Sequence, residues 1–551
     1  MQFTAFGGAA EVGATCLLLQ VADKNILMDA GIRVNKSGKA SLPDIDKLRS
    51  MATDIDLILV SHAHMDHIGA LPLVRDHYPY APIYSTLPTK EIAAIQLKDT
   101  VKIMQREADE HADNPLYNID LVLHTIWTFQ ERPFGEWFEP IEGIQVYFHP
   151  AGHVLGAAAI LLQTPEGNVV YTGDISTATQ RTVAGITPID FFKPEVLITE
   201  ATYGDSTHPS RRAEEQRLAQ SVAQVIERQG NVLIPSFALG RAQEIVLILK
   251  SFMMNGLIPQ FPIVVDGLVR TVCDLYTDML EYLPDKLQNY VRNSQQQIFW
   301  SAMRKNMPQV VKLEASERLS MLIGPPKCII SSSGMLTGGP SVFYAKTLAI
   351  EEQNAIFLTG YQDEESPGRK LQELQRGDTL KLDLREVPVT AEVNRYHLSA
   401  HADQMQMCQQ ISYVAPKQVI LLHGEWSAIQ ALRDKLVMRY VVHTPHNGET
   451  LDLSQSPEWI SDYRLQQLEG EKTAYNGDLD IAEDGSVQFR LPPDLTQSPL
   501  WQQFFQGYKH VRAKFMGKRL HIRGIDLADD VAPSVDEDTP PPSSDADEIE
   551  G

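Results

Sequence analysis

The chain has 551 residues, of which 43% are hydrophobic and 22% charged, and its formal net charge is −23. This length exceeds one ordinary domain, so two or three domains are expected. The acidic balance argues against a protein that binds nucleic acid through bulk positive charge. No run of about 18 apolar residues predicts a transmembrane helix, so we expect no membrane partner. The four cysteines lie far apart in the sequence and favour reduced thiols in a cytoplasmic protein.

The first two hundred residues predict a strand-rich region with helical interludes. Its candidate strands are residues 15–21, 25–29, 55–60, 144–149, 158–164, 168–172 and 196–199. The run at 55–60 is apolar and β-branched, as is typical of a buried strand. A histidine-rich block follows it directly, on the loop that leaves the strand end, where functional side chains are commonly held.

This block contains His62, His64, Asp66 and His67 within six positions. Imidazole and carboxylate are zinc ligands, and this spacing after an apolar strand predicts a metal site, although a lone His-x-His would mean little. His62 and His64 can reach one ion because alternate residues of an extended stretch point the same way. Asp66 and His67 would turn toward a second ion, which lies about 3.5–4 Å away in two-metal hydrolytic sites. Further ligands must come from elsewhere in the chain, because these residues cannot complete both ions.

Three further residues are candidates for the rest of the centre. His153 lies between Gly152 and Gly156, and glycines permit tight backbone around it. Asp174 follows a strand, where a buried carboxylate is costly unless it is paired or binds metal. Asp29 ends another strand, and we expect it to hold the metal loop by hydrogen bonds. His153 or Asp174 alone would more often be structural, but together with the histidine block they nearly complete a two-metal set.

Beyond residue 200, candidate strands alternate with candidate helices, which predicts a parallel α/β module. Residues 387–425 then return to strands and carry two more candidate histidines, so this module is expected to be inserted into the first domain. The expected parts are 1–203 and 385–452 for the first domain, 204–384 for the insertion, 453–525 for a small C-terminal region of unknown role, and 526–551 for an acidic, disordered tail. Within residues 501–523, basic residues among aromatics favour a solvated basic helix, with RNA binding or subunit packing as alternatives.

Asp29, the 62–67 block, His153 and Asp174, in this order, resemble the metallo-β-lactamase fold. Other segments resemble its β-CASP branch, which includes RNase J and the endonuclease subunit of the eukaryotic pre-mRNA 3′-end cleavage machinery. These segments are Glu200-Ala201-Thr202-Tyr203-Gly204, Leu398-Ser399-Ala400-His401-Ala402-Asp403, Leu421-Leu422-His423-Gly424-Glu425, residues 234–244 and residues 331–335. The resemblance covers about residues 1–450. It implies an α/β fold in which a metallo-β-lactamase αββα sandwich is interrupted by an inserted β-CASP α/β domain.

The resemblance also implies roles for individual residues. His62, His64 and His153 would bind one zinc ion, Asp66, His67 and His423 a second, and Asp174 both. His401 would be the general acid, oriented by Glu200, because a histidine paired with a carboxylate can supply a proton near neutral pH. The implied cofactors are therefore two Zn²⁺. The implied activity is a zinc-dependent ribonuclease that activates water at two metals and leaves a 5′-phosphate and a 3′-hydroxyl.

The His423 segment favours RNA over DNA by resemblance, and single-stranded RNA is the expected partner. Candidate phosphate contacts are Arg241, Ser331, Ser332, Ser333, Arg369 and His397, which offer hydroxyls, backbone N–H groups and cations. Each has an ordinary alternative as a turn, a surface charge or a structural histidine.

The sequence leaves other functions open. A small-molecule metallo-hydrolase is disfavoured because it would not need the insertion or the segments around His401 and His423. A non-catalytic scaffold subunit is disfavoured because every expected ligand is present. Endonuclease activity is favoured over 5′-exonuclease activity, although the sequence does not separate the two modes. A homodimer and membership of an RNA-processing complex are both compatible with the sequence, and it does not identify the physiological RNA target.

Overall fold

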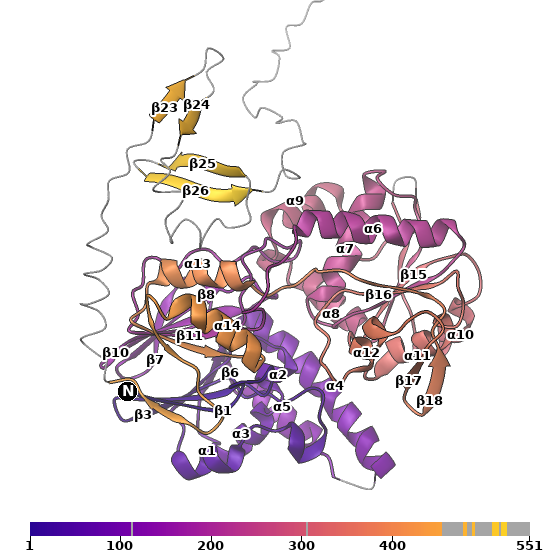
Figure 1. Cartoon of the computed structure of the whole chain (residues 1–551). Helices are drawn as coiled ribbons and strands as arrows, with labels where there is room; N and C mark the ends of the chain where they lie inside the picture. The colour runs from indigo at the N-terminus through magenta and orange to yellow at the C-terminus, as the bar shows by residue number, and fades with distance from the viewer. Residues whose placement is uncertain are drawn as a thin grey trace, which may run out of the picture. The chain divides into compact units, whose positions relative to one another are not determined.

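The computed structural model describes residues 1–111, 114–304 and 307–454, and four strands within residues 478–525. The chain forms two compact units, Met1–Arg464 and Leu465–Gly551. Figure 1 shows the first unit as two adjoining parts, a sandwich of sheets and helices and a second α/β part. No helix of the described residues is long and apolar enough to cross a membrane.

Two seven-stranded sheets form the sandwich. The first has the order β22-β1-β2-β3-β4-β5-β6. Its strands are β1 (Gln2–Gly7), β2 (Cys16–Val21), β3 (Lys24–Met28), β4 (Leu57–Leu59), β5 (Ile83–Ser85), β6 (Phe129–Glu131) and β22 (Thr450–Asp452). The second has the order β21-β20-β11-β10-β9-β8-β7. Its strands are β7 (Trp137–Ile141), β8 (Ile144–Pro150), β9 (Ala158–Thr164), β10 (Gly167–Tyr171), β11 (Val196–Glu200), β20 (Gln418–Leu422) and β21 (Val441–His443).

Apolar side chains on both faces of these strands hold the four layers together. Leu17 and Leu19 of β2 belong to the same buried cluster as Ile160 of β9, between the two sheets. The alternate residues Leu18 and Leu161 belong to the cluster beneath the helices, as the two-residue period of a strand requires. Near-continuous apolar runs in the sequence thus become strands buried on both faces.

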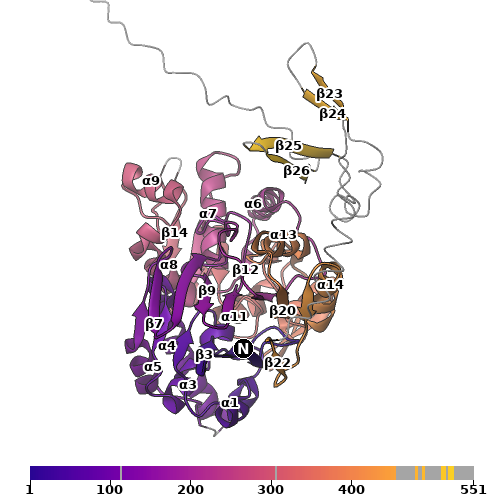
Figure 2. The same ribbon diagram turned by 90° about the vertical axis from the view of Figure 1, so that its left-hand side faces the viewer.

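Helices cover the outer faces of the sandwich (Figures 1 and 2). On the first sheet lie α1 (Ile45–Met51), α3 (Leu71–His77), α4 (Leu87–His111) and α5 (Ile119–Trp127). On the second lie α13 (Gln404–Val414) and α14 (Trp426–Leu436). The predicted αββα arrangement is confirmed.

The inserted part is built on a six-stranded sheet with the order β14-β13-β15-β12-β16-β19, in which every neighbouring pair is parallel. Its strands are β12 (Val232–Pro235), β13 (Ile263–Asp266), β14 (Val310–Lys312), β15 (Cys328–Ser331), β16 (Ala355–Leu358) and β19 (Glu392–Arg395). Its helices include α6 (Arg211–Glu227), α7 (Arg241–Met254), α8 (Leu268–Asp278), α9 (Asp285–Ser294), α10 (Arg318–Met321), α11 (Gly339–Leu348) and α12 (Pro367–Glu373). A hairpin of β17 (Thr379–Leu382) and β18 (Arg385–Pro388) follows.

The insertion leaves the sandwich after β11 and returns before β20, which pairs with β11 in parallel. Two chain segments more than two hundred residues apart therefore lie side by side in one sheet. β19 still pairs with β16 in the sheet of the insertion. We therefore propose that the chain re-enters the first domain after Arg395, about ten residues later than the expected boundary at 385.

In the second unit, the described residues form two antiparallel hairpins. They are β23 (Asp478–Ile481) with β24 (Val487–Arg490), and β25 (His510–Met516) with β26 (Arg519–Ile525). The expectation of a basic helix is wrong for β25 and β26. Basic and apolar residues alternate there, as in Val511-Arg512-Ala513-Lys514-Phe515, and this period of two is typical of a strand. The acidic tail at 526–551 lies outside the described residues.

Candidate metal centre

The histidine block spans the loop after β4, which carries His62 and His64, and the short helix α2 (Met65–Ile68), which carries Asp66 and His67. Backbone groups of the segment after β1 and of the loop after β3 hold this helix in place. The N–H of Thr15 donates to the carbonyl of Asp66 at 2.9 Å, and that of Ala30 donates to the carbonyl of His67 at 2.8 Å. A Cβ on Gly31 would lie 1.7 Å from the carbonyl oxygen of Asp66, so only glycine fits there. The metal loop is therefore packed rigidly against the first sheet.

Three imidazoles converge on one face of Asp174. His64 Nδ1 lies 3.1 Å from His62 Nε2 and 3.0 Å from His153 Nε2. The carboxylate oxygen Oδ2 of Asp174 lies 3.5 Å from His62 Nε2 and 3.6 Å from His153 Nε2. Gly152, beside His153, has a φ of +76°, which a residue with a side chain rarely adopts.

A second group gathers around the other oxygen of Asp174. Oδ1 lies 3.5 Å from His67 Nε2 and 3.7 Å from His423 Nε2. His423 Nε2 also lies 3.7 Å from Asp66 Oδ2. One carboxylate thus faces two ligand clusters, with one oxygen toward each.

These groups fit metal ions. Four ligand atoms at about 2.0–2.2 Å around a tetrahedral ion such as zinc lie about 3.3–3.6 Å apart, and the separations given above run from 3.0 to 3.7 Å. Within the described part of the chain, His67 Nε2 and Asp174 Oδ1 are buried without a hydrogen-bond partner. Such atoms are costly to bury, and a metal ion would satisfy both.

In three of the histidines, a protein group holds the ring nitrogen that faces away from Asp174. His67 Nδ1 donates to Asp29 Oδ2 at 2.8 Å, and His153 Nδ1 donates to the carbonyl of Ala400 at 2.8 Å. His423 Nδ1 lies 3.0 Å from Thr15 Oγ1, in a hydrogen bond. These partners set the orientation of each ring and leave Nε2 for a metal.

Asp29 holds several elements at once, as the sequence predicts. It is fully buried and accepts hydrogen bonds from the backbone N–H and the hydroxyl of Ser61 at 2.7 and 2.6 Å. It also accepts from the hydroxyl of Tyr171 at 2.6 Å. The carboxylate therefore joins the end of β3, the metal loop and β10.

Burial and neighbouring charges shift the pKa values of these histidines in different directions. Burial lowers the pKa of His62, His64 and His153, which favours the neutral form that binds metal. Burial acts in the same direction on His67, but the carboxylates of Asp174 and Asp29 outweigh it and raise the pKa of His67 well above its usual value. Without a metal, His67 is therefore the imidazole of this group that retains a proton at neutral pH.

His401 and Glu200 form a separate pair beside the first ligand cluster. His401 Nδ1 donates to Glu200 Oε2 at 2.9 Å, and its ring centre lies 4.6 Å from that of His153. The other oxygen of Glu200 accepts the N–H of Ile175 at 2.7 Å. Burial opposes the charged form of His401, but Glu200 and nearby carboxylates outweigh it and raise its pKa to about 9.

Three family models match this chain. The metallo-beta-lactamase superfamily matches residues 10–235, the Beta-Casp domain residues 242–371, and the Zn-dependent metallo-hydrolase RNA specificity domain residues 386–445. The transcription termination factor FttA of Methanothermobacter thermautotrophicus is 31% identical over 465 residues, which are 82% of this chain and 71% of that protein. The chain belongs to the β-CASP family of the metallo-β-lactamase superfamily.

Other relatives of this β-CASP protein carry different names. The RNase J-like protein of Methanocaldococcus jannaschii is 31% identical over 423 residues, which are 76% of this chain and 91% of that protein. Integrator complex subunit 11 of Gallus gallus is 30% identical over 480 residues, which are 86% of this chain and 77% of that protein. Membership of the family confirms the predicted resemblance and makes the chain a metal-dependent hydrolase.

The predicted phosphate contacts of this β-CASP protein are spread over the insertion. Arg241 begins α7 and is 8% exposed, and Ser331 is buried at the end of β15. Ser332 follows it, and the hydroxyl of Ser333 hydrogen bonds with Thr337 at 3.1 Å. The described contacts place none of these serines against the two ligand clusters.

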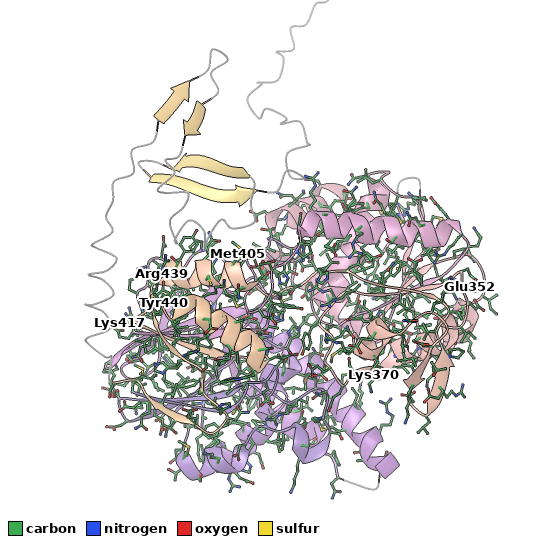
Figure 3. The ribbon with its side chains drawn as sticks, viewed as in Figure 1. Glu352, Lys370, Met405, Lys417, Arg439 and Tyr440 are labelled. Atoms are coloured by element: carbon green, nitrogen blue, oxygen red, sulfur yellow. The ribbon has the colours of Figure 1, made fainter. Side chains whose placement is uncertain are left out.

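The other two predicted phosphate contacts have protein partners. Arg369 pairs with Glu373 on its own helix α12 at 3.2 Å, and Lys370 follows on the same helix (Figure 3). His397 is exposed, and its backbone N–H donates to Glu214 at 2.7 Å. Only their positions in the sequence support Arg369 and His397 as phosphate contacts.

Sequence reasoning missed the partners of the ligands. Thr15, Ser61 and Tyr171 touch the far side of ligands or of Asp29, and so does the carbonyl of Ala400. Ser61 could have been found, because it directly precedes His62. Thr15 and Tyr171 carry no signal, since a threonine and a tyrosine within predicted strands are ordinary core residues.

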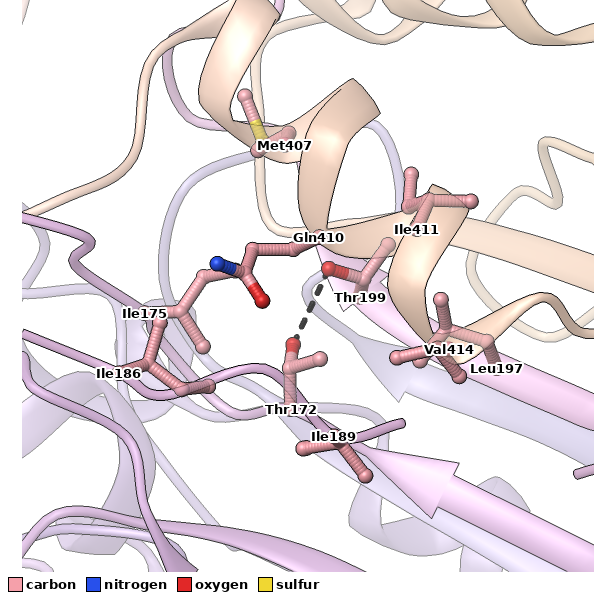
Figure 4. A pocket seen from close by; sticks show the side chains of 10 residues that line it. All are labelled: Thr172, Ile175, Ile186, Ile189, Leu197, Thr199, Met407, Gln410, Ile411 and Val414. Carbon is pink, nitrogen blue, oxygen red and sulfur yellow. Dashed lines mark hydrogen bonds between the residues drawn. The ribbon is translucent and has the colours of Figure 1, made fainter. Parts of the chain in front are cut away.

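Behind the centre, α13 packs on the second sheet around a small cavity of about 10 Å³ (Figure 4). Met407, Ile411 and Val414 of α13 line it, and the hydroxyl of Thr172 donates to that of Thr199 at 3.1 Å across it. This volume is at the limit for one water molecule, so the cavity is a packing gap and no substrate site. The packing fixes the start of α13, directly after His401.

Proposed function

We propose that this chain is a two-zinc ribonuclease that hydrolyses RNA phosphodiester bonds and leaves a 5′-phosphate and a 3′-hydroxyl. The observation that carries the proposal is the position of Asp174. Its two oxygens face two separate ligand clusters, and Oδ2 also lies 4.0 Å from Nδ1 of His401. Two metal positions and a proton donor thus meet around one carboxylate.

In this proposal, His62, His64 and His153 hold one zinc ion, Asp66, His67 and His423 hold the other, and Asp174 binds both. When bound, the zinc ions supply Lewis acidity, which lowers the pKa of a water molecule and neutralises phosphate charge. Asp29 keeps the Nδ1 proton of His67 on the far side of the ring, so that Nε2 keeps its lone pair.

His401 supplies the proton for the leaving group. Glu200 accepts from Nδ1, so the proton to be transferred is the one on Nε2. Because the pKa of His401 is raised to about 9, the imidazolium is present at neutral pH. We propose that it protonates the 3′-oxygen as the P–O3′ bond breaks, which yields the 3′-hydroxyl.

The match to an RNA specificity domain at residues 386–445, which include His401 and His423, supports RNA as the substrate. The names of relatives, an RNase J-like protein and a subunit of the Integrator complex, support nuclease activity and work within a larger complex. We propose that the substrate is single-stranded and that the chain acts either as a homodimer or as part of an RNA-processing complex. Four thiols without a disulfide support a cytoplasmic location.

Digestion of three labelled RNAs tests the activity and its mode. They are a single-stranded RNA with a 5′-monophosphate, the same RNA with a 5′-triphosphate, and a circular RNA. We favour endonuclease activity, which predicts cutting of the circle and little effect of the 5′ group. Strong preference for the monophosphate and an intact circle would show a 5′-exonuclease instead.

Assays on the same purified chain test the two alternative functions. Hydrolysis of lactams or thioesters without cleavage of any RNA would favour a small-molecule hydrolase. A folded chain with far less than two zinc ions and no hydrolysis would favour a scaffold subunit. Either result would refute the proposed ribonuclease.

A further inference from the structure

Arg241 occupies an unusual position for a cation. It is the first residue of the 14-residue helix α7, where the helix dipole is positive and favours anions. Only 8% of the residue is exposed. Burial and the neighbouring Arg211 lower its pKa to about 10, so the guanidinium is still charged at neutral pH. A positive charge that is buried at a helix N-terminus is destabilising unless an anion compensates it.

The carboxylate of Glu244, three residues later on α7, is already used. Glu244 is fully buried and accepts from the N–H of Arg181 at 2.9 Å and from the N–H and hydroxyl of Thr182 at 2.7 Å each. It also pairs with Arg211 at 2.8 Å. These four hydrogen bonds fill the acceptor positions of Glu244, so none remains for Arg241.

Charges in this region therefore do not balance. Arg181 and Arg211 pair with Glu215 and Glu244, and Arg241 is a third cation beside two carboxylates. Among the described residues, Arg241 forms no ion pair, and its Nε and Nη1 are buried without a hydrogen-bond partner. Each of these N–H groups can donate to an anion. Within this group of three arginines and two glutamates, one positive charge thus has no carboxylate partner.

This charge lies beside the candidate centre. A Cβ on Gly240 would lie 2.7 Å from Cγ1 of Val154, the residue after His153, so the start of α7 touches the loop of a predicted ligand. The positive charge of Arg241 favours the ionised form of Tyr203 and so acts to lower the pKa of Tyr203. The ring centre of Tyr203 lies 6.1 Å from that of His401. Arg241 is therefore near the part of the centre that carries His153 and His401.

We propose that Arg241 binds a backbone phosphate of the RNA on the leaving-group side of the scissile bond. The inference rests on the proposed ribonuclease function and gives this residue a substrate-binding role in it. A phosphate would form a charge-assisted pair with the exposed part of this guanidinium and would be favoured by the helix N-terminus. The same anion would neutralise the surplus charge, so binding of substrate removes a cost that the free protein carries.

Thermal unfolding of the full chain tests the surplus charge without any RNA. The matched control is Arg318→Met, because Arg318 pairs with the fully buried Asp266 at 2.7 Å. That substitution leaves a buried carboxylate unpaired and lowers the unfolding temperature by several degrees. Arg241→Met is expected to leave it unchanged or to raise it. Inorganic sulfate, as a probe for a phosphate group, is expected to raise it more in the parent than in Arg241→Met.

Binding of a labelled single-stranded RNA tests the ligand. The full chain carries His401→Ala, so that the RNA stays intact. Adding Arg241→Met is expected to weaken binding about tenfold or more, the effect of losing a charge-assisted contact. The slope of log affinity against log salt is expected to fall by about 0.7, the value for one phosphate on a single strand. The control Arg228→Met, whose guanidinium pairs with Glu392 at 2.7 Å, is expected to change neither.

The outcomes separate this inference from the proposed function. If the parent binds RNA and Arg241→Met binds it with the same affinity and salt slope, the role of Arg241 is refuted and the ribonuclease proposal stands. If the parent neither binds nor cuts RNA, the ribonuclease proposal fails. In that case the unfolding data decide. The anion site is refuted if Arg241→Met loses as much stability as Arg318→Met. It is also refuted if sulfate raises the unfolding temperature of the parent and of Arg241→Met equally.

Discussion

His401 donates its Nδ1 proton to Glu200, with 2.9 Å between Nδ1 and Oε2. Glu200 ends β11, the last strand before the insertion, and His401 lies beyond it, just before α13. The two residues meet because β20 returns beside β11. The insertion thus separates in sequence a pair that the second sheet brings together in space.

Replacing Glu200 by glutamine should move the alkaline limit of activity. The general acid must be protonated, so the rate falls as pH rises through the pKa of His401, which is about 9 in the native pair. Without the carboxylate that pKa falls, and the alkaline limb of kcat/KM against pH shifts to lower pH. We expect activity at about pH 8 to fall about 10- to 100-fold. Glu195→Gln, which removes a half-exposed partner of Lys417, should leave the profile unchanged, and an unshifted limb in Glu200→Gln would refute the pairing.

Removing metal should destabilise the chain and abolish activity. Without metal, the ligand atoms that face Asp174 would be buried without the ion that they share. A chelator should therefore lower the unfolding temperature. Elemental analysis of the purified chain should find two zinc ions. Asp66→Ala should leave about one, because Asp66 belongs to one cluster only, with His67 and His423. An unchanged zinc content in Asp66→Ala would contradict the proposed division of ligands.

Binding of metal to the metal-free protein should release protons. The pKa of His67 is raised by Asp174 and Asp29 in spite of burial, so this ring is protonated at neutral pH before metal binds. It must become neutral to bind a metal, and affinity for that ion should therefore rise with pH. Calorimetry in buffers of different ionisation heat would measure the release. We expect about one proton per chain from His67 at neutral pH, and a release near zero would show that this histidine is already neutral.

Asp29→Asn should weaken metal binding without removing a ligand. Asp29 accepts four hydrogen bonds, two from Ser61 and one each from His67 and Tyr171. The side-chain amide of asparagine would point its own N–H groups at some of the N–H and O–H groups that donate to Asp29. We expect zinc affinity to fall about 10- to 100-fold and the free energy of unfolding to fall by about 1–3 kcal/mol.

Competition with a chromophoric chelator and denaturant unfolding would measure the two effects of Asp29→Asn. Asp56→Asn is the matched control, because Asp56 is half-buried and accepts the N–H of Asn25 at 2.8 Å. Equal zinc affinity in the two variants would show that Asp29 does not orient the ligands.

The sequence predicts the core of the centre well, because its ligands follow buried strands. The block from His62 to His67 directly follows one buried strand, and Asp174 follows another, so residue type and position together indicate metal binding. His401 and His423 lie beyond the insertion, and only the resemblance connected them to the block. Tyr171 and Thr15 could not be predicted, because their role depends on which side chains the two sheets bring together.

One error concerns an element whose signal is local and weak. The basic charges within residues 501–523 favour a helix, whereas the alternation of basic and apolar residues at 510–525 is that of the hairpin that forms. The end of the insertion after Arg395 stays our proposal, and nothing in the sequence shows that Glu392–Arg395 pairs with β16. The missing partner of Arg241 also has no sequence signal, because it depends on Glu244 being used by Arg181, Thr182 and Arg211.

Cleavage of a single-stranded RNA by the purified, zinc-loaded chain tests the central claim most directly, with His401→Ala and Asp66→Ala measured beside it. Unchanged thermal unfolding of His401→Ala and retained helix and sheet content of both variants would show that they fold. The account predicts products with a 5′-phosphate and a 3′-hydroxyl, and a loss of activity of about 100-fold or more in each variant. Full activity in both variants, or no cleavage by the zinc-loaded parent, would contradict it.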